Sequence, residues 1–137
     1  MIQMFHVTKS YPGDPPVLRD IHLDIQKGEF VFLTVPSGAG KSTLLKLLFL
    51  AERATSGQVL ISGKNIARLR ESGVPYLRRN IGVVFQDFKL LKNRTVCDNV
   101  GFTLDVVGTP RDVVRQKVTQ ILNRVVLEHK IDVLPPK

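Results

Sequence analysis

The chain has 137 residues, 43% of them hydrophobic and 23% charged, which predicts one globular domain with a modest core and excludes a disordered or collagen-like chain. The formal net charge is +8, but Lys and Arg are scattered, so the sequence predicts a basic solvated surface and no nucleic-acid partner. A single cysteine, Cys97, excludes an intrachain disulfide, and no run approaches the ~20 apolar residues of a membrane helix.

The N-terminal part of the chain predicts two strands joined by a loop. Residues 2–7 are typical of a short strand, and residues 9–16 are rich in Pro and Gly, which favours a loop. Residues 17–25 alternate between apolar and polar side chains, as a half-buried strand does. Tyr11 lies in the loop, where an aromatic ring either stacks on a nucleotide base or covers the sheet edge; its spacing alone favours the second role. These strands predict a small antiparallel β layer.

The next stretch carries the clearest chemical signal. Residues 30–33 are an apolar run, predicted to be a strand covered on both faces, and they lead into a loop of small residues. Residues 41–50 follow as a mainly apolar, and therefore buried, helix. The loop sequence SGAGKST resembles the phosphate-binding P-loop, Gly-x-x-x-x-Gly-Lys-Ser/Thr. A glycine-rich turn without a ligand is the alternative, but this sequence between a strand and a helix favours phosphate binding.

The residue types of this loop suit a polyphosphate, which needs many converging N–H donors. Gly38 and Gly40 allow backbone conformations that a side chain forbids, so the amides point to the anion at the positive end of the helix. Lys41 is predicted to reach the β- and γ-phosphates, and Ser42 to offer its hydroxyl to Mg²⁺. The residues predicted to bind the nucleotide here are Ser37, Gly38, Ala39, Gly40, Lys41, Ser42 and Thr43.

Val35 stands where the motif has its first glycine. A β-branched residue resists a positive φ, so the loop is strained or reshaped if that position needs one. If the position needs only a small side chain, Val35 crowds the loop. The sequence leaves both alternatives open.

The remaining elements follow in order. Residues 58–61 predict a strand, residues 69–79 are polar and basic, and residues 81–85 form a compact apolar run that predicts a buried strand. Gln86 follows that run; an amide there binds Mg²⁺ or a water, or bonds the backbone of a turn, and the second role is favoured without context. Thr109 is a plausible N-cap of a C-terminal helix, with an apolar stripe that consists of Val114, Val118, Ile121, Leu122 and Val125.

In this order, the segments resemble the ATP-binding subunits of ABC systems, over essentially the whole chain. The resemblance rests on the P-loop together with residues 77–87, LRRNIGVVFQD. Residues 87–96, DFKLLKNRTV, resemble the cell-division members of the family more than its lipoprotein-releasing or macrolide-type ATPases, which remain an alternative. The implied fold is α/β: a P-loop NTPase core, incomplete, with an N-terminal antiparallel β layer and a C-terminal helical segment.

The resemblance also implies roles for individual residues. Tyr11 falls where the family stacks an aromatic ring on the adenine of ATP, and Gln86 falls where the family's glutamine meets Mg²⁺ and the attacking water. Lys41 then has a catalytic role with Gln86, and Ser42 is the second Mg²⁺ ligand. Residues 87–94 match the region that touches the membrane subunit, so the protein is expected at the cytoplasmic face of the bacterial inner membrane, held there by that partner. Complete family members act as homodimers.

Several departures from the family pattern affect the function. Cys97 replaces the Tyr that is usual in this subgroup, and Val35 replaces a glycine. No Leu-Ser-Gly-Gly signature and no apolar run ending in Asp-Glu occurs in residues 1–137, which match the N-terminal part of the ATP-binding domain. Two hypotheses follow: an ATPase seen here in part, or a truncated, inactive nucleotide-binding or interaction module. On either, residues 1–137 alone are expected to turn over no ATP.

Overall fold

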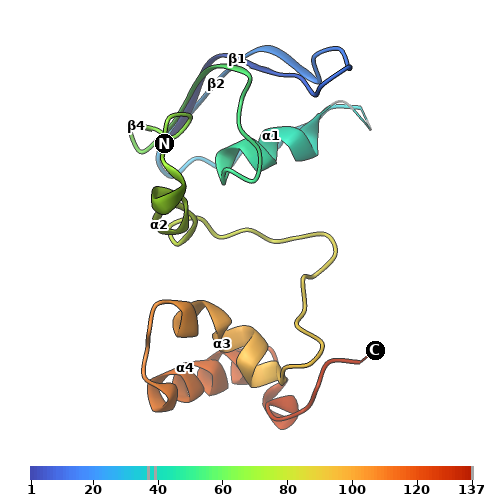
Figure 1. Cartoon of the computed structure of the whole chain (residues 1–137). Coiled ribbons are helices and arrows are strands. Elements are labelled where there is room, and N and C mark those ends of the chain that lie inside the picture. Colours follow the sequence, from blue (N-terminus) through green and yellow to red (C-terminus); the bar gives the residue numbers. More distant parts are fainter. Residues whose placement is uncertain (37, 39, 137) are drawn as a thin grey trace. The chain divides into compact units, whose positions relative to one another are not determined.

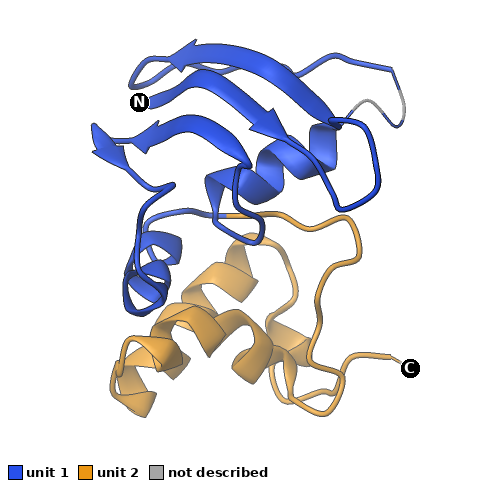
Figure 2. Ribbon diagram, turned by 45° about the horizontal axis from the view of Figure 1, so that its top comes forward, with its two compact units in different colours: residues 1–82 blue, residues 83–137 orange. Residues whose placement is uncertain are grey.

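The computed structural model describes residues 1–36, 38 and 40–136, in two compact units: residues 1–82 and residues 83–137 (Figure 2). Each unit has its own hydrophobic core. In chain order the strands and helices are β1 (Ile2–Lys9), β2 (Leu18–Ile25), α1 (Lys41–Leu48), β3 (Ser56–Ile61), β4 (Lys64–Asn65), α2 (Val74–Arg78), α3 (Val96–Val106) and α4 (Arg111–Arg124). Short 3-10 turns lie at Glu71–Gly73 and Glu128–Lys130.

The first unit is a four-stranded antiparallel sheet with α1 packed against it (Figure 1). The strand order is β2-β1-β3-β4, so β1 pairs with β2 on one side and β3 on the other. The alternation predicted for β2 is confirmed, because its odd-numbered residues from Ile21 to Ile25 are half-buried and the residues between them are exposed. The buried core consists of Met4, Val7, Leu18, Leu44, Leu47, Leu50, Val59, Ile66 and Val74. The predicted antiparallel β layer is therefore confirmed.

Two strands expected from the sequence are not formed, and those predictions are wrong. Residues 30–33 and 81–85 have no regular secondary structure, and their apolar side chains face solvent. Phe30 is 83% exposed and Val84 is fully exposed. A strand needs backbone partners on a neighbouring strand, and the described residues form ladders only among β1 to β4. An apolar run is typical of a buried parallel strand, but the run alone does not provide the neighbouring strands with which it must pair.

The second unit is a pair of helices, α3 and α4. Val114, Val118 and Leu122 of α4 form its buried core, and residues of α3 pack against them. Gly101 of α3 allows this approach, since a Cβ atom there would lie 2.6 Å from Cγ1 of Val114. The predicted helical segment is thus confirmed.

Details of α4 differ from the sequence prediction. Pro110, not Thr109, is at the N-cap position, and the amide of Thr109 instead donates to the carbonyl of Leu104 at 3.0 Å. Ile121 and Val125 of the predicted stripe are 51% and 56% exposed, because the seam with α3 covers only one side of the helix. Within the described part of the chain, no helix combines the length and the apolar character needed to cross a membrane.

Candidate nucleotide-binding loop

Helix α1 begins with an open N-terminus. Gly40 is its N-cap, with φ +90 and ψ 7, and its carbonyl accepts the bond from the amide of Leu44 at 2.8 Å. Among the described residues, no side chain caps this end and no acidic residue lies in the first turn. The first-turn N–H groups and the positive end of the helix dipole are therefore left for an anion.

The two described glycines of the loop have different surroundings. A Cβ atom at Gly40 would lie 2.8 Å from Cδ2 of Leu18 and 3.1 Å from the carbonyl oxygen of Val17. Gly38 has φ +82, and a Cβ atom there would meet nothing within 4 Å. Gly40 therefore fixes the helix end of the loop against the start of β2, while Gly38 leaves space above the loop that a ligand could occupy.

Lys41 folds back over the loop. Its Nζ donates a hydrogen bond to the carbonyl oxygen of Val35 at 3.1 Å, which links the two ends of the loop. The ammonium group has three donors, so it retains N–H groups for a second acceptor. Val35 is not among the described residues that adopt a positive φ, so the strained form of this loop considered from the sequence is not the one observed.

The other predicted loop residues are placed as follows. Ser42 is exposed and Thr43 is half-buried, both in the first turn of α1. Ser37 and Ala39 lie outside the described residues. A polyphosphate fits this loop by its chemistry: an open helix end, an exposed ammonium group and space over Gly38.

Tyr11 lies in the loop that joins β1 and β2, and its ring is next to the ion pair between Lys9 and Glu52. Nζ of Lys9 is 4.7 Å from the centroid of the Tyr11 ring and 2.9 Å from Oε2 of Glu52. The hydrogen bond from Lys9 lowers the pKa of Glu52, although desolvation acts in the opposite direction. The carboxylate therefore holds Lys9 in place under the ring. Stacking of Tyr11 on adenine stays a prediction.

Gln86 and residues 87–94 belong to the second unit. Gln86 is an exposed residue of a turn, and Nζ of Lys89 lies 2.5 Å from Oδ2 of Asp87. The hydrogen bond from Lys89 lowers the pKa of Asp87. Since Gln86 and Lys41 lie in different units, a shared position at the γ-phosphate stays a prediction.

Asn99 fixes the segment that precedes α3, and sequence analysis missed it. Its Oδ1 accepts from the amide of Leu91 at 2.8 Å, and its Nδ2 donates to the carbonyl oxygens of Leu91, Arg94 and Thr95 at 2.9 to 3.0 Å. Thr95 and Asp98 form a capping box at the same helix end. The spacing Thr-x-x-Asp is the sequence signal that could have found this helix start.

Comparisons with known proteins identify the family of the chain. The ABC transporter family model matches residues 18–136. The chain is 49% identical over 136 residues to the cell division ATP-binding protein FtsE of Mycobacterium tuberculosis and 46% identical over 135 residues to that of Bacillus subtilis. Both matches cover 98% of this chain but only 59% of the relative, so the chain spans about three fifths of the length of these relatives.

One similar solved structure is a dimeric ATP-binding cassette in a post-hydrolysis state with bound ADP and Pi. Its TM-score is 0.88 with 30% sequence identity, and the match covers 98% of this chain and 62% of that chain. The matched part of the chain therefore has the fold of an ABC ATPase cassette.

Proposed function

We propose that this chain, which belongs to the ABC transporter family, carries the ATP-binding loop and the membrane-subunit contact of an FtsE-type cell-division ATPase. The observation that carries the proposal is the loop before α1. There the first turn of α1 is uncapped, Gly40 has a left-handed backbone, and the ammonium group of Lys41 bonds back across the loop to the carbonyl of Val35. The likeness to FtsE proteins supports the cell-division assignment.

The loop residues bind the triphosphate of ATP in this proposal. The first-turn N–H groups of α1 and the backbone around Gly38 donate to phosphate oxygens, and Lys41 turns its remaining N–H groups to the β- and γ-phosphates. Ser42 and Gln86 would hold Mg²⁺, which when bound would neutralise charge on the transferred phosphoryl group. Gln86 also orients the attacking water, and Tyr11 stacks on the adenine.

The contact with a membrane subunit is assigned to residues 87–94. This subunit is FtsX-like, and it holds the ATPase at the cytoplasmic face of the inner membrane. The four hydrogen bonds of Asn99 support this assignment, because they give the end of the segment one fixed shape for a partner to recognise. The complete ATPase acts as a homodimer.

Binding of a fluorescent ATP analogue with Mg²⁺ tests the proposal. Lys41→Met is expected to weaken binding at least tenfold, because the ammonium group that meets the phosphates is lost. Lys46→Met, in the last turn of the same helix, is the matched control and is expected to bind as the parent chain does. Equal affinity of the parent chain and Lys41→Met would contradict the proposal.

A further inference from the structure

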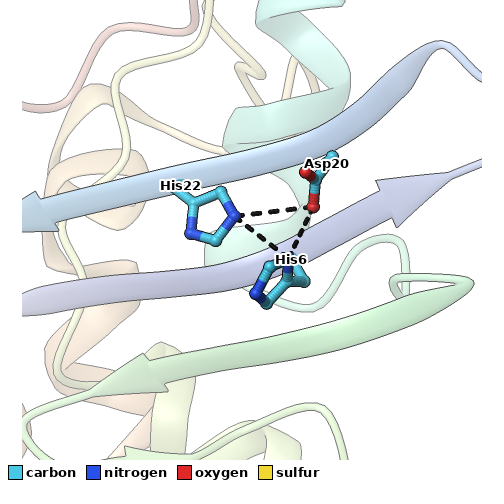
Figure 3. Close-up of side chains that lie close together, drawn as sticks. All are labelled: His6, Asp20 and His22. Carbon is cyan, nitrogen blue, oxygen red and sulfur yellow. Dashed lines mark hydrogen bonds and ion pairs between the residues drawn. The ribbon is translucent and has the colours of Figure 1, made fainter.

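Three side chains that could bind a metal ion meet on the exposed face of the sheet, and none of them belongs to the phosphate loop. Nδ1 of His6 lies 2.8 Å from Oδ1 of Asp20, and Nε2 of His22 lies 3.1 Å from that same Nδ1 (Figure 3). Nε2 of His22 is 3.5 Å from Oδ1 of Asp20. Figure 3 shows both rings and the carboxylate turned toward one another from β1 and β2.

Two β-bulges bring these side chains together. Between the pairs Met4–Leu23 and Val7–Ile21, β1 has one extra residue, and between Val7–Ile21 and Lys9–Leu18, β2 has one extra residue. His6 lies in the first bulge and Asp20 in the second, and both have φ +50. The bulges interrupt the strand alternation, so each strand exposes two successive residues there.

The shape of the first bulge is fixed by the backbone of the neighbouring strand. Gly57 of β3 has φ +90, and a Cβ atom there would lie 2.3 Å from the carbonyl oxygen of His6. Only glycine allows β3 to approach the bulge so closely. Strand packing therefore constrains the backbone of His6 in addition to the contacts among the three side chains.

The three atoms share few protons. A ring nitrogen carries at most one proton, and Asp20 is an acceptor only. With the proton on His6 Nδ1, the N–H donates to Oδ1 of Asp20, and the lone pair of His22 Nε2 lies 3.5 Å from that oxygen. With the proton on His22 Nε2 alone, the lone pair of His6 Nδ1 lies 2.8 Å from the oxygen. A cation among the three atoms would instead be attracted by all three lone pairs.

The distances suit one transition-metal ion. The three donor atoms lie on a circle of radius about 1.8 Å, so an ion about 2.0–2.1 Å from each lies just outside their plane. Imidazole suits zinc, copper and nickel, whereas calcium and magnesium prefer oxygen ligands. The side chains of His6 and Asp20 are 75% and 64% exposed, which leaves room for water as a further ligand.

We propose that His6 Nδ1, His22 Nε2 and Asp20 Oδ1 bind one divalent transition-metal ion, with zinc as the probe, that clips β1 to β2 across the paired bulges. This site uses none of the residues assigned to ATP. It therefore stands or falls independently of the proposed function.

Zinc titration of the full, tag-free chain after removal of metal by a chelator tests the site. Calorimetry is expected to give one zinc ion per chain. Asp20→Asn and His22→Gln are each expected to weaken zinc binding at least about tenfold, as changes at metal sites do. His6→Asn does the same while keeping a residue that tolerates the left-handed conformation. The remaining histidine, in His129→Gln, is the matched control and is expected to leave binding unchanged.

Two further measurements separate a built site from loose surface binding. Zinc is expected to raise the unfolding temperature of the parent chain but not of His22→Gln, because a ligand stabilises only the state that binds it. Lys41→Met is expected to keep zinc binding in full. Absence of zinc binding by the parent chain at micromolar zinc, or equal binding by the variants of His22 and His129, would overturn the proposal.

Discussion

Replacing Gly40 by Ala is expected to destabilise the first unit more than the same change at Gly38. Both residues have a positive φ, so both alanine variants adopt a left-handed backbone that L-residues disfavour. Only Gly40 also lies against the start of β2, where the new methyl group would overlap Cδ2 of Leu18. Leu18 is 5% exposed and belongs to the core, so it has little room to move.

The size of the difference follows from these two causes. The left-handed backbone costs an alanine about 1–2 kcal/mol at either position. Overpacking of a core side chain adds about 1–3 kcal/mol at Gly40 alone. We therefore expect a loss of about 2–5 kcal/mol in the free energy of unfolding for Gly40→Ala and about 1–2 kcal/mol for Gly38→Ala.

Urea unfolding followed by circular dichroism measures both variants against the parent chain at low protein concentration. ATP binding is a second readout, because Gly40 is the N-cap of α1 and a shift of that residue moves the first-turn N–H groups. If Gly38→Ala lost as much stability as Gly40→Ala, the packing of the loop against Leu18 would not be the cause, and the reasoning would fail.

Three other outcomes are expected. Asn99→Ala should speed hydrogen exchange of the Leu91 amide by at least tenfold, because that amide loses its acceptor. The hydrogen bonds from Arg115 lower the pKa of Asp132 from its ordinary value of 3.8. Their contribution to stability is therefore present above pH 3.8 and lost as the pH falls through the lowered pKa. In an NMR titration, the Arg115→Gln variant should show the ordinary midpoint for Asp132. Val35→Gly should change ATP affinity less than threefold, since Val35 has no positive φ to relieve and its carbonyl group remains; a larger gain would show crowding by the side chain.

The sheet could be predicted from sequence because its signals are local. The alternation over β2 and the glycines at both ends of β3 each report on a few neighbouring residues. The paired bulges could not be predicted, since an extra residue in a strand is defined only by the register with its neighbouring strand. The cluster of His6, Asp20 and His22 depends on that register, so the sequence alone does not indicate it.

The phosphate loop was predicted as a motif, but its anchoring was not. Which glycine is held by packing depends on Leu18, more than twenty positions earlier in the chain. The hydrogen bond from Lys41 to Val35 depends on backbone geometry that no residue type specifies. The start of α3 could be predicted from the spacing of Thr95 and Asp98, which apolar periodicity alone does not indicate.

Only the α1 end of the phosphate loop packs against the hydrophobic core. Gly40 and the buried residues of α1 fix the helix end, whereas residues 30–33 lie exposed and without regular structure before the other end. Lys41 is then the tie between the two ends, and the same ammonium group is the one assigned to the phosphates. A buried parallel strand is covered on both faces, so pairing of residues 30–33 with a neighbouring strand would cover the apolar side chains that are exposed here. That pairing would give the other end of the loop a second support, and the ammonium group of Lys41 could then turn from Val35 to the phosphates.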